Sequence, residues 1–175
     1  MRSAPPIIFF SCLLPVPAGA VGELLGSGHR LGGDLRVVEE DAVFGVFCRR
    51  WGVPLIDGGT VRLPRLIGHS RAMDLILTGR AVAAQEALAM GLANRVVANG
   101  ESRPVAEDLA AALARLPQGC LRADRLSAIT QWGEPLSAAM AAEFASLSRV
   151  AAESIEGARR FAGGAGRHGA PPDCT

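Results

Sequence analysis

The stretch from Ala42 to Gly68 holds the residue types best suited to chemistry. Asp57 directly precedes two glycines, Gly58 and Gly59, and a short helical run follows them. Adjacent glycines before a helix let the backbone approach a ligand closely and leave its amide groups available. The aspartate could carry a proton, or it could only shape the turn through an Asx-type hydrogen bond or cap the helix. The pattern indicates a ligand-binding loop in which Asp57 is either the catalytic acid–base residue or a structural one.

Other side chains in the same stretch could contact a ligand. Phe47 and Trp51 could line an apolar pocket or pack in the core. Cys48 could be a nucleophile, but no base lies near it in the sequence, and an inert buried thiol is the alternative. Arg49 and Arg50 could reach an anion such as a phosphate, or could form a solvated surface. The sequence leaves both roles open for each of these residues.

Short strands and short helices alternate around this loop. We expect strands at 35–38, 42–44 and 94–97, a polar loop at 48–50, and helices at 60–66 (interrupted at Pro64), 71–77 (capped by Ser70) and 84–90 (ended by Gly91). This alternation predicts an α/β fold built from repeating β–α layers.

The second half of the chain reads as helical. Apolar residues recur at helical spacing in 105–116, and further helices are predicted at 121–132, 136–150 and 154–161. These helices could form an arm that packs on a neighbouring subunit, or a layer within one subunit.

The first 33 residues are consistent with two interpretations. A basic start, an apolar run at 7–14 and small residues at 18–20 resemble a secretory signal peptide. The alternative is a divergent or disordered start with no packed role, because its prolines and glycines break both helix and strand.

Composition excludes several classes of function. The 175 residues allow one domain, and 18 basic residues against 17 acidic ones give no field that would attract nucleic acid or a membrane surface. Every basic residue is Arg, which excludes Schiff-base and lysine general-base chemistry. The 4 cysteines and 3 histidines are scattered, so we expect no metal site, and we expect reduced thiols in a cytoplasmic protein.

A set of short motifs, in order and in register, closely resembles the crotonase (enoyl-CoA hydratase/isomerase) superfamily between about Gly33 and Gly169. The motifs are Asp34-Leu35-Arg36, Phe44-Gly45, Gly58-Gly59-Thr60 with Arg62-Leu63, Leu66-Ile67-Gly68, Leu77-Thr78-Gly79-Arg80, and Glu86-Ala87 through Gly91-Leu92 with Val96-Val97. None is specific alone, but together they imply the later turns of a ββα spiral followed by an α-helical C-terminal arm. The expected divisions are a divergent segment at 1–33, the spiral at 34–100, helices at 101–169 and a tail at 170–175.

The resemblance also implies a chemistry. Relatives of this kind hold an acyl-CoA thioester oxygen with two backbone N–H groups while carboxylates move protons, so an enolate is stabilised as in an oxyanion hole. Coenzyme A would be part of the substrate, with no separate cofactor, and the protein would form a homo-oligomer, a trimer or hexamer. Phe47, Cys48, Trp51, Gly58 and Gly59 would then contact the substrate, with Asp57 as the catalytic residue.

The sequence departs from the family pattern at the catalytic positions. Gly28 and Cys48 stand where hydratases of the family carry glutamates, and nothing earlier resembles the segment that supplies the first oxyanion-hole amide. These departures favour isomerase-type or related chemistry over hydration, with Asp57 as the remaining acid. The alternative is a truncated, non-catalytic module that binds coenzyme A or serves in oligomerisation.

Overall fold

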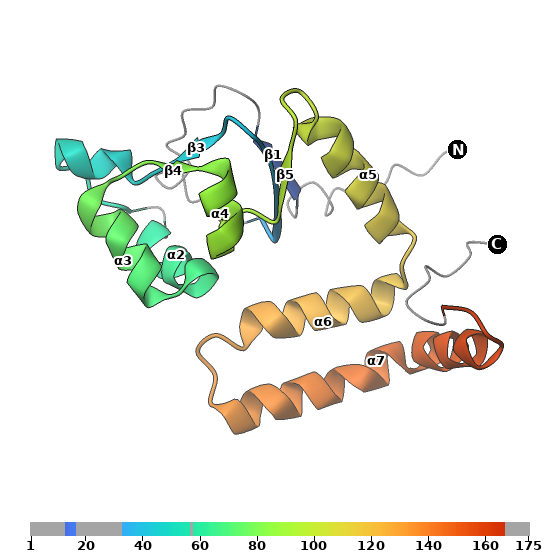
Figure 1. The fold of residues 1–175 in the computed structure, drawn as a ribbon. Helices are drawn as coiled ribbons and strands as arrows, with labels where there is room; N and C mark the ends of the chain where they lie inside the picture. Colours follow the sequence, from blue (N-terminus) through green and yellow to red (C-terminus); the bar gives the residue numbers. More distant parts are fainter. Residues whose placement is uncertain (1–12, 17–32, 57, 167–175) are drawn as a thin grey trace, which may run out of the picture. The chain divides into compact units, whose positions relative to one another are not determined.

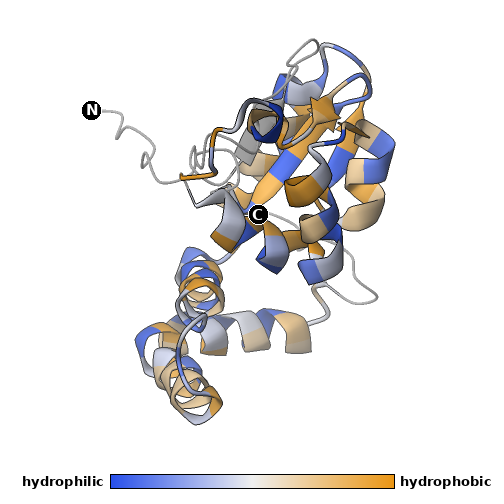
Figure 2. Cartoon of the chain, turned by 90° about the vertical axis from the view of Figure 1, so that its left-hand side faces the viewer, coloured by the Kyte–Doolittle hydropathy of each residue, from blue (hydrophilic) through white to orange (hydrophobic). Residues whose placement is uncertain are grey.

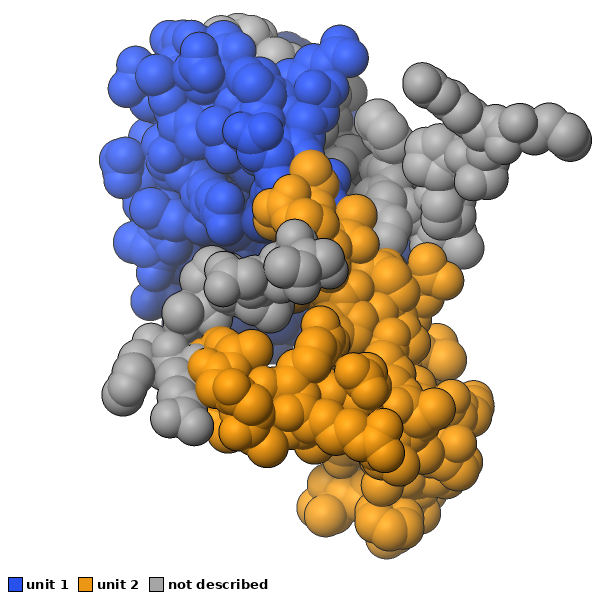
Figure 3. All heavy atoms as spheres, turned by 90° about the vertical axis from the view of Figure 1, so that its right-hand side faces the viewer, with its two compact units in different colours: residues 1–110 blue, residues 111–175 orange. Residues whose placement is uncertain are grey.

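A computed structural model describes residues 13–16, 33–56 and 58–166 of the chain (Figure 1). The chain divides into two compact units, residues 1–110 and 111–175, which Figure 3 colours blue and orange. The first unit is mixed α/β and the second is helical. The α/β fold class predicted from the sequence is confirmed.

A parallel three-stranded sheet lies in the first unit. Its strands are β1 (Leu13–Val16), β2 (Leu35–Glu39) and β5 (Arg95–Val97), in the order β1-β2-β5. Val38 of the central strand pairs with Val16 on one side and Val96 on the other. Strand β1 lies in a segment expected to form neither helix nor strand; that expectation is wrong for these residues, because β2 supplies a parallel partner.

A second, antiparallel pair consists of β3 (Val43–Phe44) and β4 (Val82–Ala83). Strand β3 is followed by a 3₁₀ helix, η2 (Phe47–Trp51), in place of the expected polar loop. The sequence did not predict β4, since two residues carry no periodic signal.

Helices α2 (Gly59–Ile67), α3 (His69–Thr78) and α4 (Ala84–Met90) follow one another in the described part of this unit. Helix α2 continues through Pro64 instead of being interrupted there. The N–H that proline lacks would have bonded four residues back, to the carbonyl of the exposed Thr60 near the helix start, where water can replace it.

The structure contradicts the predicted start of α3 and confirms the predicted end of α4. Gly68, with φ +81°, separates α2 from α3 and is the N-cap of α3, so the predicted cap at Ser70 is wrong. Helix α4 has its predicted bounds and ends at Gly91, whose φ of +84° is the left-handed conformation expected there.

One hydrophobic core joins these elements. Phe44, Leu63, Leu75, Val82 and Leu92 are fully buried in it and come from β3, α2, α3, β4 and the turn after α4. Aliphatic residues and alanine supply most of the remaining core, as the low aromatic content of the sequence predicts.

The chain then becomes helical. Helix α5 (Ser102–Ala114) leads to α6 (Gln118–Thr130) and α7 (Leu136–Ala162), which pack side by side as a hairpin in the second unit (Figure 1). The prediction of two helices over 136–161 is wrong, because Ala151, Ala152 and Glu153 are good helix formers and Ser154 bonds back to the Val150 carbonyl.

Large apolar side chains remain exposed on these helices, and Figure 2 shows hydrophobic residues along them in orange. In the described part of the chain, no helix combines the length and the apolar character needed to cross a membrane.

Candidate functional site

The Gly58–Gly59 turn starts helix α2. Gly58 adopts φ +81°, and its carbonyl accepts the first helical hydrogen bonds from Val61 (3.2 Å) and Arg62 (2.9 Å). The amides of Gly59 and Thr60 precede these bonds, so the helix itself gives them no partner. A Cβ on Gly58 would lie 2.6 Å from Nη1 of Arg62, the far end of a flexible side chain, so it is the positive φ that favours glycine at this position.

Asp57, the predicted catalytic residue, lies outside the described residues. Its role as acid–base residue or as a turn residue therefore stays a prediction.

The predicted substrate-binding side chains of η2 lie in different environments. Phe47 is half-buried, and the Arg50 guanidinium lies 5.0 Å from its ring centroid, a cation–π distance. Cys48 is a free thiol that packs against the hydrophobic core. Trp51 is 82% exposed, so the core-packing alternative for this residue is wrong.

Arg49 and Arg50 bind main-chain carbonyl groups. Nε of Arg49 donates to the carbonyl of Ile76 at 3.1 Å, and Nη2 of Arg50 donates to that of Gly79 at 2.9 Å. Both arginines thereby attach η2 to the end of α3. Both residues are exposed, as the solvated-surface alternative predicts, but each also makes a specific hydrogen bond to the main chain.

Helix α3 is the shared support of the predicted site, since both η2 and α2 pack against it. The structure thus brings Phe47, Cys48 and Trp51 together in one turn and places Gly58 and Gly59 at the start of a helix on the same support. A groove lies elsewhere, between α6 and α7 in the second unit, and is lined by Ala123, Ser127, Ala142 and Arg149 among others. None of the residues lining that groove belongs to the predicted site.

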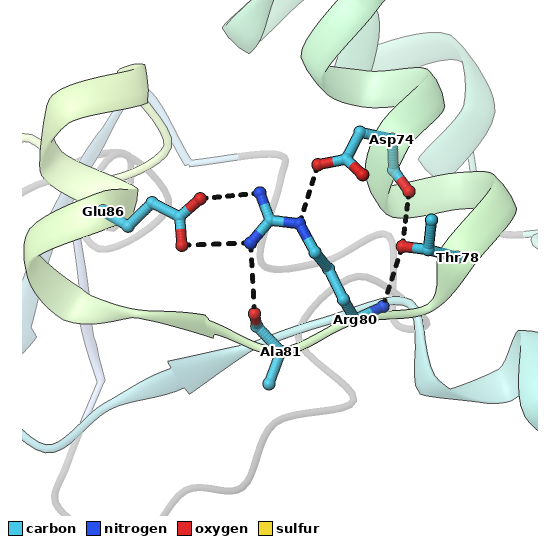
Figure 4. Close-up of polar contacts among 5 residues, drawn as sticks. All are labelled: Asp74, Thr78, Arg80, Ala81 and Glu86. Atoms are coloured by element: carbon cyan, nitrogen blue, oxygen red, sulfur yellow. Dashed lines mark hydrogen bonds and ion pairs between the residues drawn. The ribbon is translucent and has the colours of Figure 1, made fainter.

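The turn after α3 contains a polar network centred on Arg80 (Figure 4). The Leu77-Thr78-Gly79-Arg80 motif did not by itself reveal that this arginine connects two helices. Arg80 donates from Nε to Asp74 (2.7 Å) and from Nη1 and Nη2 to both carboxylate oxygens of Glu86 (3.0 and 2.6 Å). Hydrogen bonds to Glu86 and then Asp74 raise the pKa of Arg80, and the Arg80 hydrogen bond lowers the pKa of Glu86. The available signal was an arginine just after a helix-ending glycine, with an acid on each flanking helix.

A buried arginine fixes the strand before the site. Arg36 donates from Nε to the carbonyl of Leu92 (2.6 Å) and from Nη1 to that of Gly33 (2.7 Å), while its backbone N–H donates to Asn94. Burial lowers the pKa of this guanidinium. The arginine of the Asp34-Leu35-Arg36 motif therefore connects β2 to the segment that follows α4.

Within the described ranges, no three histidine, cysteine, aspartate or glutamate side chains are grouped so that they could hold a metal ion. The chemistry of the described site residues is that of backbone amides, a thiol, aromatic rings and guanidinium groups.

Comparison with known proteins shows which family this chain resembles. A family profile described as enoyl-CoA hydratase/isomerase matches residues 8–163, beginning well before the motifs that carry the resemblance. The Bacillus subtilis protein YngF, assigned as an enoyl-CoA hydratase/isomerase, is 46% identical over 103 residues, which cover 57% of this chain and 39% of YngF.

Two solved structures resemble the fold. An enoyl-CoA hydratase subunit I from Geobacillus kaustophilus matches with a TM-score of 0.80 and 30% identity, over 90% of this chain and 61% of that one. A Thermobifida fusca protein assigned as an enoyl-CoA hydratase, solved in complex with CoA, matches with a TM-score of 0.73 and 27% identity, over 83% of this chain and 56% of that one.

The chain spans less than two thirds of the length of each of these relatives. The profile match nevertheless covers most of its own 175 residues. This chain belongs to the enoyl-CoA hydratase/isomerase family.

Proposed function

We propose that the chain acts on an acyl-CoA thioester by moving a proton through an enolate, as an isomerase-type member of its family. The observation that carries the proposal is the family match over residues 8–163, a range that includes the glycine turn of Gly58 and Gly59. The Thermobifida fusca relative, which was solved with CoA, supports a CoA thioester as the ligand.

In this mechanism the Asp57 carboxylate removes a proton from the α carbon of a 3-enoyl thioester. The negative charge moves to the thioester oxygen, where backbone N–H groups stabilise it. The same carboxyl then returns the proton to the γ carbon, so the double bond moves from C3–C4 to C2–C3 with no net gain or loss of atoms. Isomerisation is favoured over hydration because Cys48 cannot activate water as a glutamate does.

The proposed oligomerisation has its own observation. Leu136, Met140 and Phe144 repeat at helical spacing on α7 and are 77%, 60% and 79% exposed. Such a row is typical of a helix face that packs on another subunit. The proposed homo-oligomer, a trimer or hexamer, would bury it whether or not the chain is an enzyme.

Three measurements on the purified protein test these proposals. Absorbance assays follow crotonyl-CoA hydration and the isomerisation of a 3-enoyl-CoA, calorimetry follows CoA binding, and light scattering gives the mass. Isomerisation exceeding hydration supports the proposed enzyme. Oligomers that neither bind CoA nor turn over either thioester would show that the chain is an oligomerisation module instead.

A cytoplasmic location is also part of the proposal. It rests on the scattered cysteines of the sequence and on free thiols at Cys48 and Cys120. A fluorescent fusion imaged in the source cells would test it, and an organellar or exported signal would contradict it.

A further inference from the structure

Gly79 brings the end of α3 into direct contact with η2. Its φ of +58° lies in the left-handed region, which favours glycine. A Cβ at this position would lie 3.1 Å from the carbonyl oxygen of Val46, the residue before η2, and 3.5 Å from Cβ of Arg49. A side chain here would therefore press on the backbone that leads into η2.

The arginines of η2 complete this contact from the other side. The last four carbonyl groups of a helix have no partner within it. The Ile76 carbonyl, in the last turn of α3, accepts from Arg49, and the Gly79 carbonyl accepts from Arg50. Arg50 also lies over the Phe47 ring, so one guanidinium contacts both the turn and a predicted site residue.

Arg80 fixes the other half of the turn. Its backbone N–H donates to Oγ1 of Thr78 (3.1 Å), and that hydroxyl donates to the Asp74 carbonyl (2.6 Å). Its guanidinium bonds to Asp74 on α3 and to Glu86 on α4 (Figure 4). The turn is therefore attached to α3, to α4 and to η2 at once.

We propose that the Gly79–Arg80 turn is a positioning element that sets the placement of η2, and with it of Phe47 and Cys48, in the ligand site. Gly79 determines how closely η2 approaches α3, and Arg80 holds the turn against the two helices. The link to ligand binding rests on the proposed function, whereas the link to η2 placement rests on the contacts alone.

Cys48 provides a direct reporter of η2 placement. Its thiol is half-buried against the core, and Cys120 is a second half-buried free thiol in the other unit. Maleimide labelling of the full chain, resolved by peptide mass spectrometry, gives the rate at Cys48 relative to that at Cys120. This ratio cancels changes that affect the chain as a whole.

The variants are Gly79→Ala and Arg50→Gln, with Gly91→Ala as the matched control. Gly91 also ends a helix in the left-handed conformation, but a Cβ there would meet only the Leu66 carbonyl oxygen, at an ordinary 3.6 Å. We expect Gly79→Ala to raise the Cys48 to Cys120 ratio about fivefold, because destabilising the closed form by about the free energy of one hydrogen bond increases local opening by that factor. Gly91→Ala should leave the ratio unchanged.

Arg50→Gln keeps the glycine and removes one hydrogen bond, so it tests the same contact even where Gly79→Ala does not fold. An unchanged ratio in Arg50→Gln, or equal ratios in Gly79→Ala and Gly91→Ala, would overturn the positioning role. Acyl-CoA affinity measured on the same proteins separates the two proposals. A wild-type chain that binds no acyl-CoA would overturn the proposed function while the labelling ratio still decides the role of the turn.

Discussion

The carboxylate of Glu39 accepts two hydrogen bonds from Ser102, one from its hydroxyl group at 2.7 Å and one from its backbone N–H at 3.3 Å. Both residues are buried, at 2% and 3% exposure, although 63 positions separate them in the chain. Glu39 ends β2 and Ser102 begins α5. Glu39 is the first of three consecutive acidic residues, Glu39-Glu40-Asp41, and its carboxylate holds the start of a helix.

Ser102→Ala is expected to lower the free energy of unfolding by about 1–3 kcal/mol, because it removes the hydroxyl bond to a buried carboxylate. Urea unfolding followed by circular dichroism measures this change. Ser70→Ala is the matched control, since Ser70 lies in the first turn of α3 and is exposed. A loss for Ser102→Ala no larger than that for Ser70→Ala would show that the buried contact contributes nothing.

Two leucines on α3 test the position of the core. Leu75 is fully buried and Leu77 is 65% exposed, although they lie in the same helix. Leu75→Ala should destabilise the chain by about 2–5 kcal/mol, because it leaves a cavity in the core. Leu77→Ala should change stability by less than about 0.5 kcal/mol. Thermal and urea unfolding would contradict this packing if the two variants lost similar stability.

Sequence reasoning was most successful where local chemistry decides the structure. Gly91 ends α4 in the expected left-handed conformation, and the expected bounds of α4 were correct. This is a position where the absence of a Cβ, visible in the sequence, determines the backbone.

It was less successful where distant contacts decide. The segment at 48–50 forms a 3₁₀ turn because Arg49 and Arg50 bind carbonyls at the end of α3, which no local pattern reveals. The partner of Glu39 could not be foreseen for the same reason. Within the candidate site, the glycine turn was predicted from two adjacent glycines before a helical run, whereas the exposure of Trp51 depends on how η2 packs.

Glu86 makes the Arg80 network sensitive to acid. Its pKa lies below the ordinary value in the folded chain, chiefly because of the Arg80 hydrogen bond. A lowered folded pKa gives stability that is present above the unfolded pKa and is lost as the pH falls through the folded value. The contribution of Glu86 should therefore be complete near neutral pH and disappear on acidification below about pH 4.

Glu86→Gln should flatten this part of the dependence of stability on pH, measured as the thermal midpoint from about pH 7 down to about pH 3. The control is Glu40→Gln, at an exposed acid in the turn between β2 and β3. If the thermal midpoint of Glu86→Gln depended on pH as steeply as that of the wild type, a role for this ion pair would be contradicted.

Glu153 caps α6 from the neighbouring helix. Its carboxylate accepts from the backbone N–H groups of Gly119 (3.1 Å) and Cys120 (2.6 Å), and the Cys120 bond is the main cause of its lowered pKa. A Cβ on Gly119 would lie 2.7 Å from Oε2, so the glycine leaves room for the carboxylate.

Glu153→Gln should speed hydrogen exchange at the amides of Gly119 and Cys120 near neutral pH, because an uncharged acceptor binds them more weakly. The difference from wild type should shrink at acidic pH, where the wild-type carboxylate is itself protonated. Mass spectrometry of peptides covering 118–121 provides the measurement, with Glu143→Gln, an exposed acid on α7, as the control. Equal exchange in Glu153→Gln and Glu143→Gln would contradict the cap.

The central claim concerns Asp57 as the proton carrier beside the Gly58 turn. The most direct measurement is the rate of 3-enoyl-CoA isomerisation by wild type, Asp57→Asn and Asp41→Asn, the last being an exposed aspartate outside the site. Loss of a general acid–base residue should slow turnover by about 10²- to 10⁴-fold in Asp57→Asn, with Asp41→Asn close to wild type. Turnover that survives unchanged in Asp57→Asn would contradict the assignment.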